Sequence, residues 1–453
     1  MEGLRRHARQ ARQGPRDPRA RPRSAMIRRP CPIRKVSPDD GWHYWFGYYD
    51  KHPWSADGTK LLAHRARFCD RFPAPDEPAE IGWIDAERGS FEAIGITLAW
   101  NWQQGAQLQW IDDGGRERIL YNDTADNRPI ARIVEPSGAE VRALPWPVHA
   151  VSPDGRTAAT LDFGRLTRLR REYGLPAAHD AHPDDPAPDT DGVWRLDLST
   201  GERTLIASIA AARDHHPNPM GDAAHHYVNH LMFNRSGSRL CFLHRFDRPD
   251  GILHSRLFTI GTDGAGLRLL MEGMVSHYDW RDDSTLLAWA GRRVLLGGGT
   301  AGPLGAAMTA ARRALKPIYY ALGKPRFLMS RVVRDSYLLI PDEENAATRP
   351  FARGELTCDG HCTFNRGGPE PGRWVVTDGY PDLRSRQPLF LWDCRRNTGY
   401  EIGRYPTPRE LDGEVRVDLH PRFNPDASVV CIDSATDGRR AMYVVDTSEL
   451  TGR

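Results

Sequence analysis

Long apolar runs and lysine are both scarce in this chain of 453 residues. No stretch of about 18 apolar residues occurs, so we expect no segment to span a membrane. Lysine stands only at positions 35, 51, 60, 316 and 324. The first 35 residues also lack the apolar core of a secretory signal, which favours a cytoplasmic protein.

The chain also lacks a large excess of charge of either sign, and its cysteines lack the spacing of a disulfide scaffold. The formal net charge is only +3, so composition gives no reason to expect a nucleic-acid partner. The seven cysteines are odd in number and are not spaced as in a small disulfide scaffold. This usage is typical of a reducing compartment, and we expect a cytoplasmic monomer.

The N-terminal segment differs in composition from the remainder of the chain. Residues 1–35 are rich in arginine and proline and contain few apolar side chains, so they cannot bury a core. We therefore expect a disordered basic tail over 1–35 and one folded domain over 36–453.

A strand-and-turn unit recurs seven times in that domain. In each unit, a short strand ends in an aromatic or apolar anchor and a polar turn follows, usually with Asp, Asn or Gly. The units begin at 50–58, 107–115, 148–155, 229–237, 276–284, 360–368 and 419–427, and their anchors are Trp54, Trp110, Val151, Phe233, Trp280, Phe364 and Phe423.

Further strands follow each turn, so every unit is a meander of three or four strands. Radial repetition of such sheets is typical of a β-propeller, and helical heptads are absent. We predict an all-β, seven-bladed propeller. The last unit ends after its third strand, and residues 27–36 are expected to supply the missing strand and close the ring.

One segment interrupts this pattern in unit five. Residues 301–335 begin as an amphipathic helix with Arg312, Arg313 and Lys316. We expect a helical insertion that packs on the propeller. A lid or a basic helix that touches a membrane surface is the alternative.

Histidine recurs at one position of the repeat. The residues three before the anchors are Lys51, Gln107, Val148, His230, His277, His361 and His420. Equal offsets on a strand face the same way, so four consecutive blades present imidazoles at one depth. This pattern favours a divalent metal, with zinc first and manganese or calcium as alternatives, and Cys362 stands beside His361. A polar channel whose histidines bond to neighbouring blades is the other interpretation.

The returning second strands end on the face where the first strands begin. Arg, His, Tyr and carboxylate side chains gather there, and loops on a rigid scaffold commonly bind ligands. We expect Lys51, Gln107, Asn122, Arg65, Asp378 and Tyr380 to contact a substrate. Structural ion pairs at blade edges are the alternative for each charged residue.

Several stretches resemble the propeller-type polysaccharide lyases, which include oligogalacturonate lyase and the ulvan lyases. The matching stretches are YYDKHPW (48–54), LQW to YND (108–123), DFGRLTRLRREYG (162–174), NHLMFN to FLHR (229–245) and DGHCTFN to VVTDGYPD (359–382). The resemblance implies a metal held by His230, His277 and either Cys362 or His361, and β-elimination on a uronic acid.

The resemblance also implies a proton-transfer residue and a cation that neutralises the substrate carboxylate. Tyr173, His244 and His64 are the candidates for acid and base, and Arg168 and Arg245 are those for neutralisation. Blade two departs from this expectation, because it offers only the amides Asn101, Gln103, Gln107 and Asn122.

Two functions follow from these patterns. The first is a metal-dependent lyase acting on an acidic oligosaccharide or polysaccharide. The second is a non-catalytic propeller that binds a glycan or a protein partner, since propellers host many unrelated functions.

Overall fold

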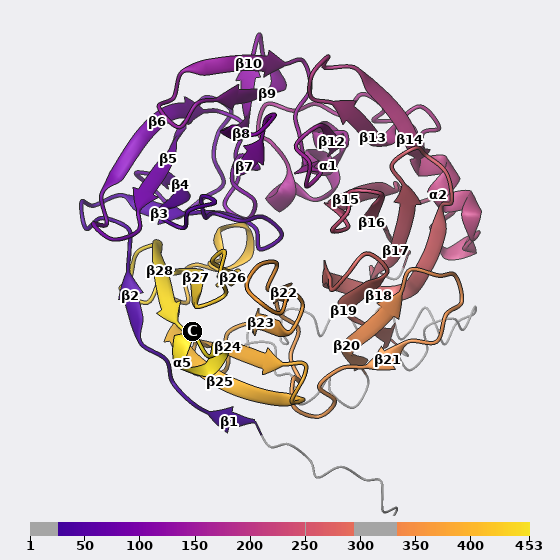
Figure 1. Ribbon diagram of the computed structural model, residues 1–453. Helices are drawn as coiled ribbons and strands as arrows, with labels where there is room; N and C mark the ends of the chain where they lie inside the picture. Colours follow the sequence, from indigo (N-terminus) through magenta and orange to yellow (C-terminus); the bar gives the residue numbers. More distant parts are fainter. Residues whose placement is uncertain (1–25, 250, 294–332) are drawn as a thin grey trace, which may run out of the picture.

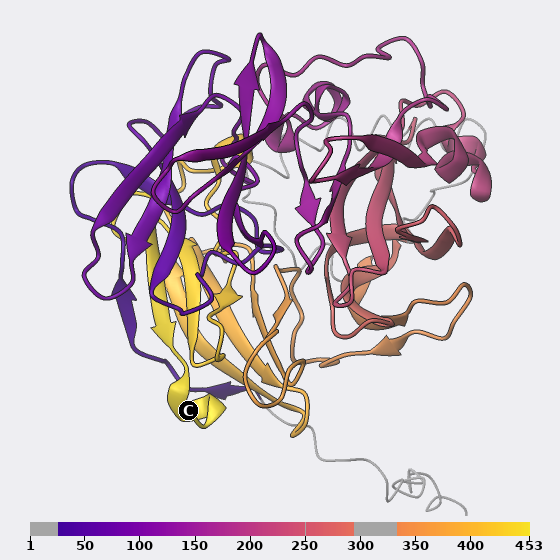
Figure 2. The ribbon, with the colours of Figure 1, turned by 45° about the horizontal axis from the view of Figure 1, so that its top comes forward.

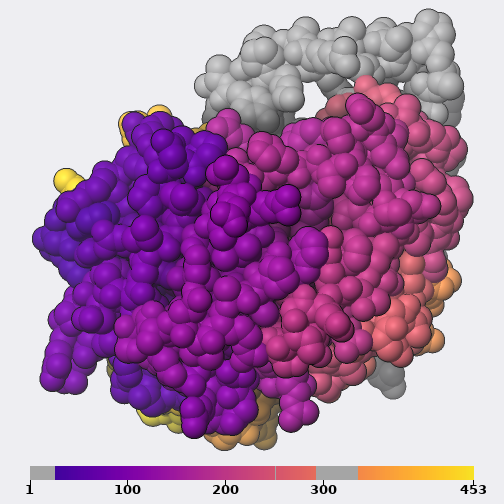
Figure 3. Space-filling view, turned by 90° about the horizontal axis from the view of Figure 1, so that it is seen from above, coloured from indigo at the N-terminus to yellow at the C-terminus, as the bar shows by residue number. Residues whose placement is uncertain are grey.

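The chain folds as an all-β propeller, in which sheets are arranged radially around a common centre (Figure 1). This computed structural model describes residues 26–249, 251–293 and 333–453. The segments follow one another in chain order around the rim (Figure 3). No described helix is long and apolar enough to cross a membrane.

The sheets follow the repeat units in order. The first sheet contains β3 (His43–Trp45), β4 (Lys60–Ala66), β5 (Ala79–Asp85) and β6 (Phe91–Thr97). The second contains β7 (Gln109–Asp112), β8 (Glu117–Ala125), β9 (Arg128–Val134) and β10 (Glu140–Leu144). The third contains β11 (Ala150–Val151), β12 (Thr157–Thr160), β13 (Gly192–Asp197) and β14 (Arg203–Ser208).

A seven-stranded sheet comes next. It contains β15 (Tyr227–Phe233), β16 (Arg239–Asp247), β17 (Leu253–Gly261), β18 (Arg268–Trp280), β19 (Thr285–Arg293), β20 (Val333–Pro341) and β21 (Arg349–Pro350). Its two halves meet within β18, where residues 268–273 pair with β17 and residues 274–280 pair with β19. Our interpretation of seven blades rests on counting these halves separately.

The last two sheets are joined to the N-terminal segment. One contains β22 (Thr363–Phe364), β23 (Trp374–Asp378), β24 (Arg386–Asp393), β25 (Thr398–Pro406) and β1 (Ile27–Arg28). The other contains β26 (Arg422–Phe423), β27 (Val429–Ser434), β28 (Ala441–Asp446) and β2 (Ile33–Lys35). β2 pairs with β28, so the N-terminal strand closes the ring as the sequence predicts (Figure 2).

This closure corrects the expected boundary of the disordered tail. Residues 26–35 belong to the propeller, because β1 and β2 satisfy backbone groups at the outer edges of two sheets. Residues 1–25 lie outside the described part of the chain. Most of the predicted helical insertion at 301–335 does too, and Val333 opens β20.

Short helices occur in the connections. These are α1 (Phe163–Leu169), α2 (Ile209–His215), α5 (Ser448–Thr451) and the 3₁₀ turns η1 (Arg171–Tyr173), η2 (Pro219–Gly221) and η3 (Gly413–Val415). Asp162 caps α1 by accepting from the N–H groups of Gly164 and Arg165. α1 and η1 together carry Tyr173 towards the centre.

The repeated turns use the same hydrogen bonds in different blades. The Asn234 side-chain oxygen accepts from the backbone N–H of Arg239, and that of Asn424 accepts from Val429, both at 3.0 Å. The anchors behind these turns pack between neighbouring sheets. Trp54, Phe233, Trp280, Phe364 and Phe423 are buried, whereas Trp110 and Val151 are half-buried.

Candidate functional site

The inner strands bring the predicted histidines to the centre through a shared backbone irregularity. His230, His420 and the equivalent Gln107 have left-handed backbones, with φ values of 55°, 43° and 55°. Strand pairing also shifts register between residues 229 and 232 and between 275 and 278. Left-handed backbone is costly for a residue with a Cβ, so its repetition marks positions that the fold fixes for a purpose.

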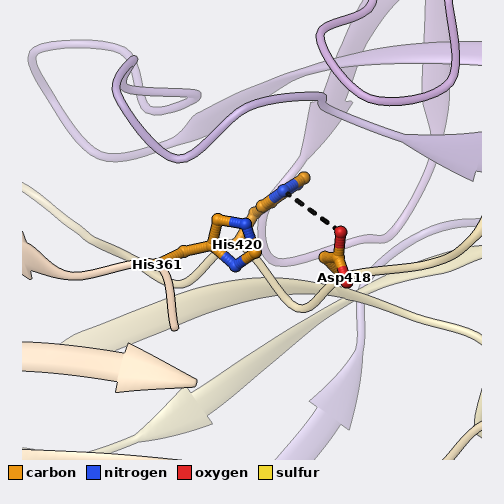
Figure 4. A group of neighbouring side chains, drawn as sticks. All are labelled: His361, Asp418 and His420. Carbon is orange, nitrogen blue, oxygen red and sulfur yellow. Dashed lines mark ion pairs between the residues drawn. The ribbon is translucent and has the colours of Figure 1, made fainter. Parts of the chain in front are cut away.

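Two of these histidines converge with a carboxylate. One ligand atom from each of His361, His420 and Asp418 lies within 4.8 Å of the others, and all three residues are buried. The two imidazole rings are 4.3 Å apart at 86°, and Asp418 points its carboxylate towards His420, 4.0 Å from Nε2 (Figure 4). Two imidazoles and one carboxylate form a donor set that suits zinc or manganese.

Hydrogen bonds to a neighbouring carboxylate, that of Asp378, orient this group. Asp378 accepts from the backbone N–H of His361 at 2.7 Å and from its ring Nδ1–H at 3.0 Å, and from the His420 backbone N–H at 3.2 Å. A ring that donates through Nδ1 leaves the Nε2 lone pair free for a metal. The Nε2 atoms of His361 and His420 have no hydrogen-bond partner among the described residues.

The electrostatics agree with this orientation. Burial alone would raise the pKa of Asp378, yet contact with His361 holds that pKa below its ordinary value. Arg416 donates from Nε to Asp418 at 2.7 Å, which keeps a cation beside the second carboxylate. The lowered pKa of Asp378 favours its charged form inside the protein.

His277 lies next to this group without belonging to it. Its ring is 4.1 Å from that of His361, and its Nδ1–H donates to Asp359 at 2.9 Å. Ser276 also donates to Asp359, at 2.8 Å. His277 thus repeats the carboxylate-to-imidazole arrangement one blade away.

His230 lies on the other side of a tyrosine. The Tyr48 ring is 5.0 Å from the rings of both His230 and His420, so Tyr48 separates them. His230 stacks on Tyr278 at 4.4 Å, and neither ring nitrogen has a hydrogen-bond partner among the described residues. Burial lowers the pKa of His230 well below its ordinary value, so the ring is neutral.

The structure turns Cys362 away from the other predicted ligands. Its thiol lies 3.8 Å from the Leu287 carbonyl oxygen, within an apolar cluster between sheets. Adjacent strand residues face opposite sides, so His361 and Cys362 cannot both face the centre.

Tyr173 and Arg245 are the predicted catalytic residues that lie near the centre. The Tyr173 hydroxyl accepts from Arg416 Nη2 at 3.1 Å, and its ring is 5.9 Å from that of Tyr48. Arg245 is buried and donates to Ser255 Oγ and the Val275 carbonyl, each at 3.0 Å. These acceptors are neutral, so the Arg245 charge has no hydrogen-bonded carboxylate among the described residues.

Three other predicted catalytic residues make structural contacts elsewhere. His64 accepts from the Ala106 backbone N–H at 3.0 Å, and His244 Nε2 lies 3.0 Å from His226 Nδ1. Arg168 donates to Asp180 at 2.8 Å. These bonds engage Nε2 of each histidine and the guanidinium of Arg168 in contacts within the protein, whereas the Nδ1 atoms of His64 and His244 have no hydrogen-bond partner among the described residues.

Some of the predicted substrate-binding residues lie beside the histidine group, and others bond to protein groups. Asp378 orients His361, and the Tyr380 ring lies 6.1 Å from that of His361. Lys51 is buried in an ion pair with Asp50. The remaining three bond to protein groups: Gln107 to Gln104, Asn122 to the Val148 backbone and Arg65 to Glu80.

Sequence reasoning missed Asp418, Arg416 and Asp359. A signal existed for Asp418, which stands two residues before His420 and so falls on the same side of an extended segment. Arg416 and Asp359 lie in connections, where no strand period places a side chain.

Comparisons with known proteins support the fold. No family model matches this chain, and no curated protein matches it in sequence. A solved oligogalacturonate lyase in complex with manganese is 16% identical, with a TM-score of 0.60 over 93% of this chain and 95% of that one. An oligogalacturonate lyase from Vibrio parahaemolyticus is 14% identical, with a TM-score of 0.55 over 92% and 93%. The resemblance to propeller-type lyases is therefore confirmed for the fold.

Proposed function

We propose that this protein is a metal-dependent lyase that cleaves uronate-containing oligosaccharides by β-elimination. The observation that carries the proposal is the convergence of His361, His420 and Asp418, whose ligand atoms lie within 4.8 Å of one another. Asp378 orients His361, and Arg416 orients Asp418. The similarity to a manganese-bound oligogalacturonate lyase adds support from outside the chain.

The three residues fit a divalent transition metal better than calcium. Calcium prefers a shell of oxygen ligands, whereas two imidazole nitrogens suit manganese or zinc. When bound, such a cation would supply positive charge for the carboxylate of the sugar. The unpartnered Nε2 atoms of His361 and His420 are the chain's own evidence for this ligand.

The proton next to a uronate carboxylate is weakly acidic, so its removal needs a base and a nearby cation. Burial favours the neutral ring of His230, and neither ring nitrogen makes a hydrogen bond among the described residues, so the ring can accept the proton. Asp50 lies 3.9 Å from Nε2 and would stabilise the protonated ring. Arg245, whose hydrogen-bonded partners are neutral, can pair with the substrate carboxylate. The Tyr173 hydroxyl can donate a proton to the leaving oxygen while Arg416 holds it in place.

We place this activity in the cytoplasm, on imported oligomers. None of the seven cysteines, which all lie in the described ranges, forms a disulfide, and this is typical of a reducing compartment. The basic helix expected within 301–335 is proposed as a second contact, with a membrane surface.

A second candidate function is glycan binding without cleavage. It is favoured by the structural bonds that hold His64, His244 and Arg168 away from the centre. Binding would then use the same central residues, with no turnover.

The test combines metal content with product formation. Purified wild-type protein should contain about one manganese or zinc per chain and release unsaturated uronates, detected by ultraviolet absorbance. His361→Ala with His420→Ala should lose the metal, whereas the peripheral pair His216→Ala with His254→Ala should keep it. His230→Ala should keep the metal and lose about 10²–10⁴-fold in kcat. Metal without product would favour the binding function, and wild type without metal would overturn the proposal.

A further inference from the structure

A repeated motif at the far end of the central strands has no part in the proposed function. Phe-Asn-Arg follows β15 as residues 233–235 and recurs after β22 as residues 364–366. Both strands lie close to the centre of the ring (Figure 1). Their histidines, His230 and His361, precede the anchor, whereas the arginines follow it. The two arginines therefore lie at the end opposite the predicted metal group.

The asparagines of this motif have a structural role that the arginines do not share. Asn234 and Asn365 close their turns by accepting from the backbone N–H groups of Arg239 and Trp374. Arg366 makes no hydrogen bond in the part of the chain that the structure describes. Its one ion-pair contact there is to Asp279, at 3.6 Å, and 37% of its side chain is exposed.

Arg235 also has hydrogen-bonding capacity to spare. Its Nη2 makes two long bonds, 3.3 Å to the Trp280 carbonyl and 3.4 Å to the Asn365 carbonyl. Its Nε is buried, and no described residue accepts from it. A buried guanidinium N–H without an acceptor is costly unless a ligand or water completes it.

Charged groups of both signs surround these two guanidinium groups. Asp279 is the carboxylate that faces both arginines, and it also accepts from the Phe364 backbone N–H at 2.8 Å. Lys51 lies close enough for Arg366 to act on its charge, and Lys51 is paired with Asp50. Two buried carboxylates thus face Arg235, Arg366 and Lys51, and the exposed Asp282 and Asp283 act on Arg235 from the solvent side. The spare capacity of the two arginines lies in their N–H donors, not in an excess of charge.

His52 shares this environment without adding charge. Burial, followed by the charge of Arg366, lowers the pKa of His52 to about 3, so the ring is neutral. It can contribute a polar contact while the guanidinium groups supply the charge.

We propose that Arg235 and Arg366 form an oxyanion-binding site at the end of the propeller axis opposite His361 and His420. Guanidinium groups bind carboxylate and phosphate oxygens through paired N–H donors, and these two have donors left over. The ligand class is a small oxyanion, either a phosphate group or the carboxylate of a uronate. The site is separate from the proposed catalytic centre and does not depend on the lyase function.

The experiment measures Tm and binding heat with inorganic phosphate and, in a second arm, with monomeric galacturonate, at constant ionic strength set with chloride. Wild-type protein should show a saturable rise in Tm of about 2 °C or more with at least one of the two anions. Arg366→Gln should abolish that rise. Arg281→Gln is the matched control, because Arg281 stands in the neighbouring turn, whereas the arginines that act on Asp279 among the described residues are Arg366 and Arg235.

Which anion gives the rise identifies the source of the oxyanion. Arg366→Lys keeps the charge but loses the paired donors, and it should weaken binding about 10-fold; it also serves if Arg366→Gln does not fold. Equal shifts in wild type and Arg366→Gln, or no shift with either anion in wild type, would overturn the proposal.

Discussion

Asp378 accepts hydrogen bonds from both the backbone N–H and the ring Nδ1–H of His361, at 2.7 Å and 3.0 Å. The same carboxylate accepts from the backbone N–H of His420 at 3.2 Å. One buried side chain at the end of β23 therefore fixes the ring of His361 and the backbone of His420, which come from different blades. Removing its charge should disturb the positions of both residues.

Asp378→Asn should weaken manganese or zinc binding by about 10–100-fold, because the amide cannot keep the His361 Nδ1–H oriented in the same way. Calorimetric titration of metal into the metal-free protein measures the change. Asp393→Asn is the control, since Asp393 is equally buried but pairs with Arg373 at the other end of the same sheet. Equal metal affinity in both variants would refute a role for Asp378 in orientation.

Gly105→Ala should destabilise the propeller by about 2–4 kcal/mol. A Cβ at this position would lie 2.3 Å from the His64 ring, and the backbone φ is +58°. Gly114→Ala controls for the backbone cost alone, because its φ is +67° and nothing lies within 4 Å of its Cβ position. Urea unfolding should show only about 1–2 kcal/mol for the control. Similar losses would mean that His64 can move aside.

Stability should fall as the solution becomes acidic, because the fold buries neutral imidazoles. Burial lowers the pKa of His64 to about 3 and that of His226 to about 4. The unfolded chain binds these protons near pH 6.5 and the folded one does not. The stability that these two neutral imidazoles contribute to the fold is therefore complete above about pH 6.5, and it is lost as the pH falls towards 4.

Each such histidine adds about 1.4 kcal/mol per pH unit to the slope of the unfolding free energy against pH. His64→Gln keeps an acceptor for the Ala106 N–H and should flatten the slope by about one proton, measured by urea unfolding between about pH 7.5 and pH 5. Exposed His179→Gln should leave the slope unchanged. An unaltered slope in His64→Gln would show that His64 is protonated in the folded state.

Arg165→Lys should cost about 2–3 kcal/mol. The side chain is 1% exposed, and its guanidinium donates to four backbone carbonyls, those of His182, Asp185, Pro186 and His226. A lysine ammonium cannot span them. Arg168→Lys, on the same helix, alters a half-exposed ion pair with Asp180 and should cost less than about 1 kcal/mol. Thermal unfolding compares the two variants. Equal losses of stability would contradict the role of Arg165 in holding the four carbonyls together.

The sequence by itself determined the repeat and the depth of the histidines. Anchors such as Phe364 and Phe423 recur because each blade must bury one side chain against its neighbour. Residues at the same distance before the anchor in each blade then face the same side of their strands. His361 and His420 could be placed at the centre on this basis. Closure of the ring by residues 27–36 followed from the missing last strand.

Only the tertiary structure decided which side chains meet. Arg416 joins the site through a connection that follows no strand period and donates to Asp418, and Asp378 bonds across a blade boundary to His420. The same packing directs Cys362 into an apolar cluster and engages His244 with His226. Local patterns set the direction of a side chain along its own strand. Contacts between residues far apart in the chain depend on how the blades pack against one another, which no local pattern encodes.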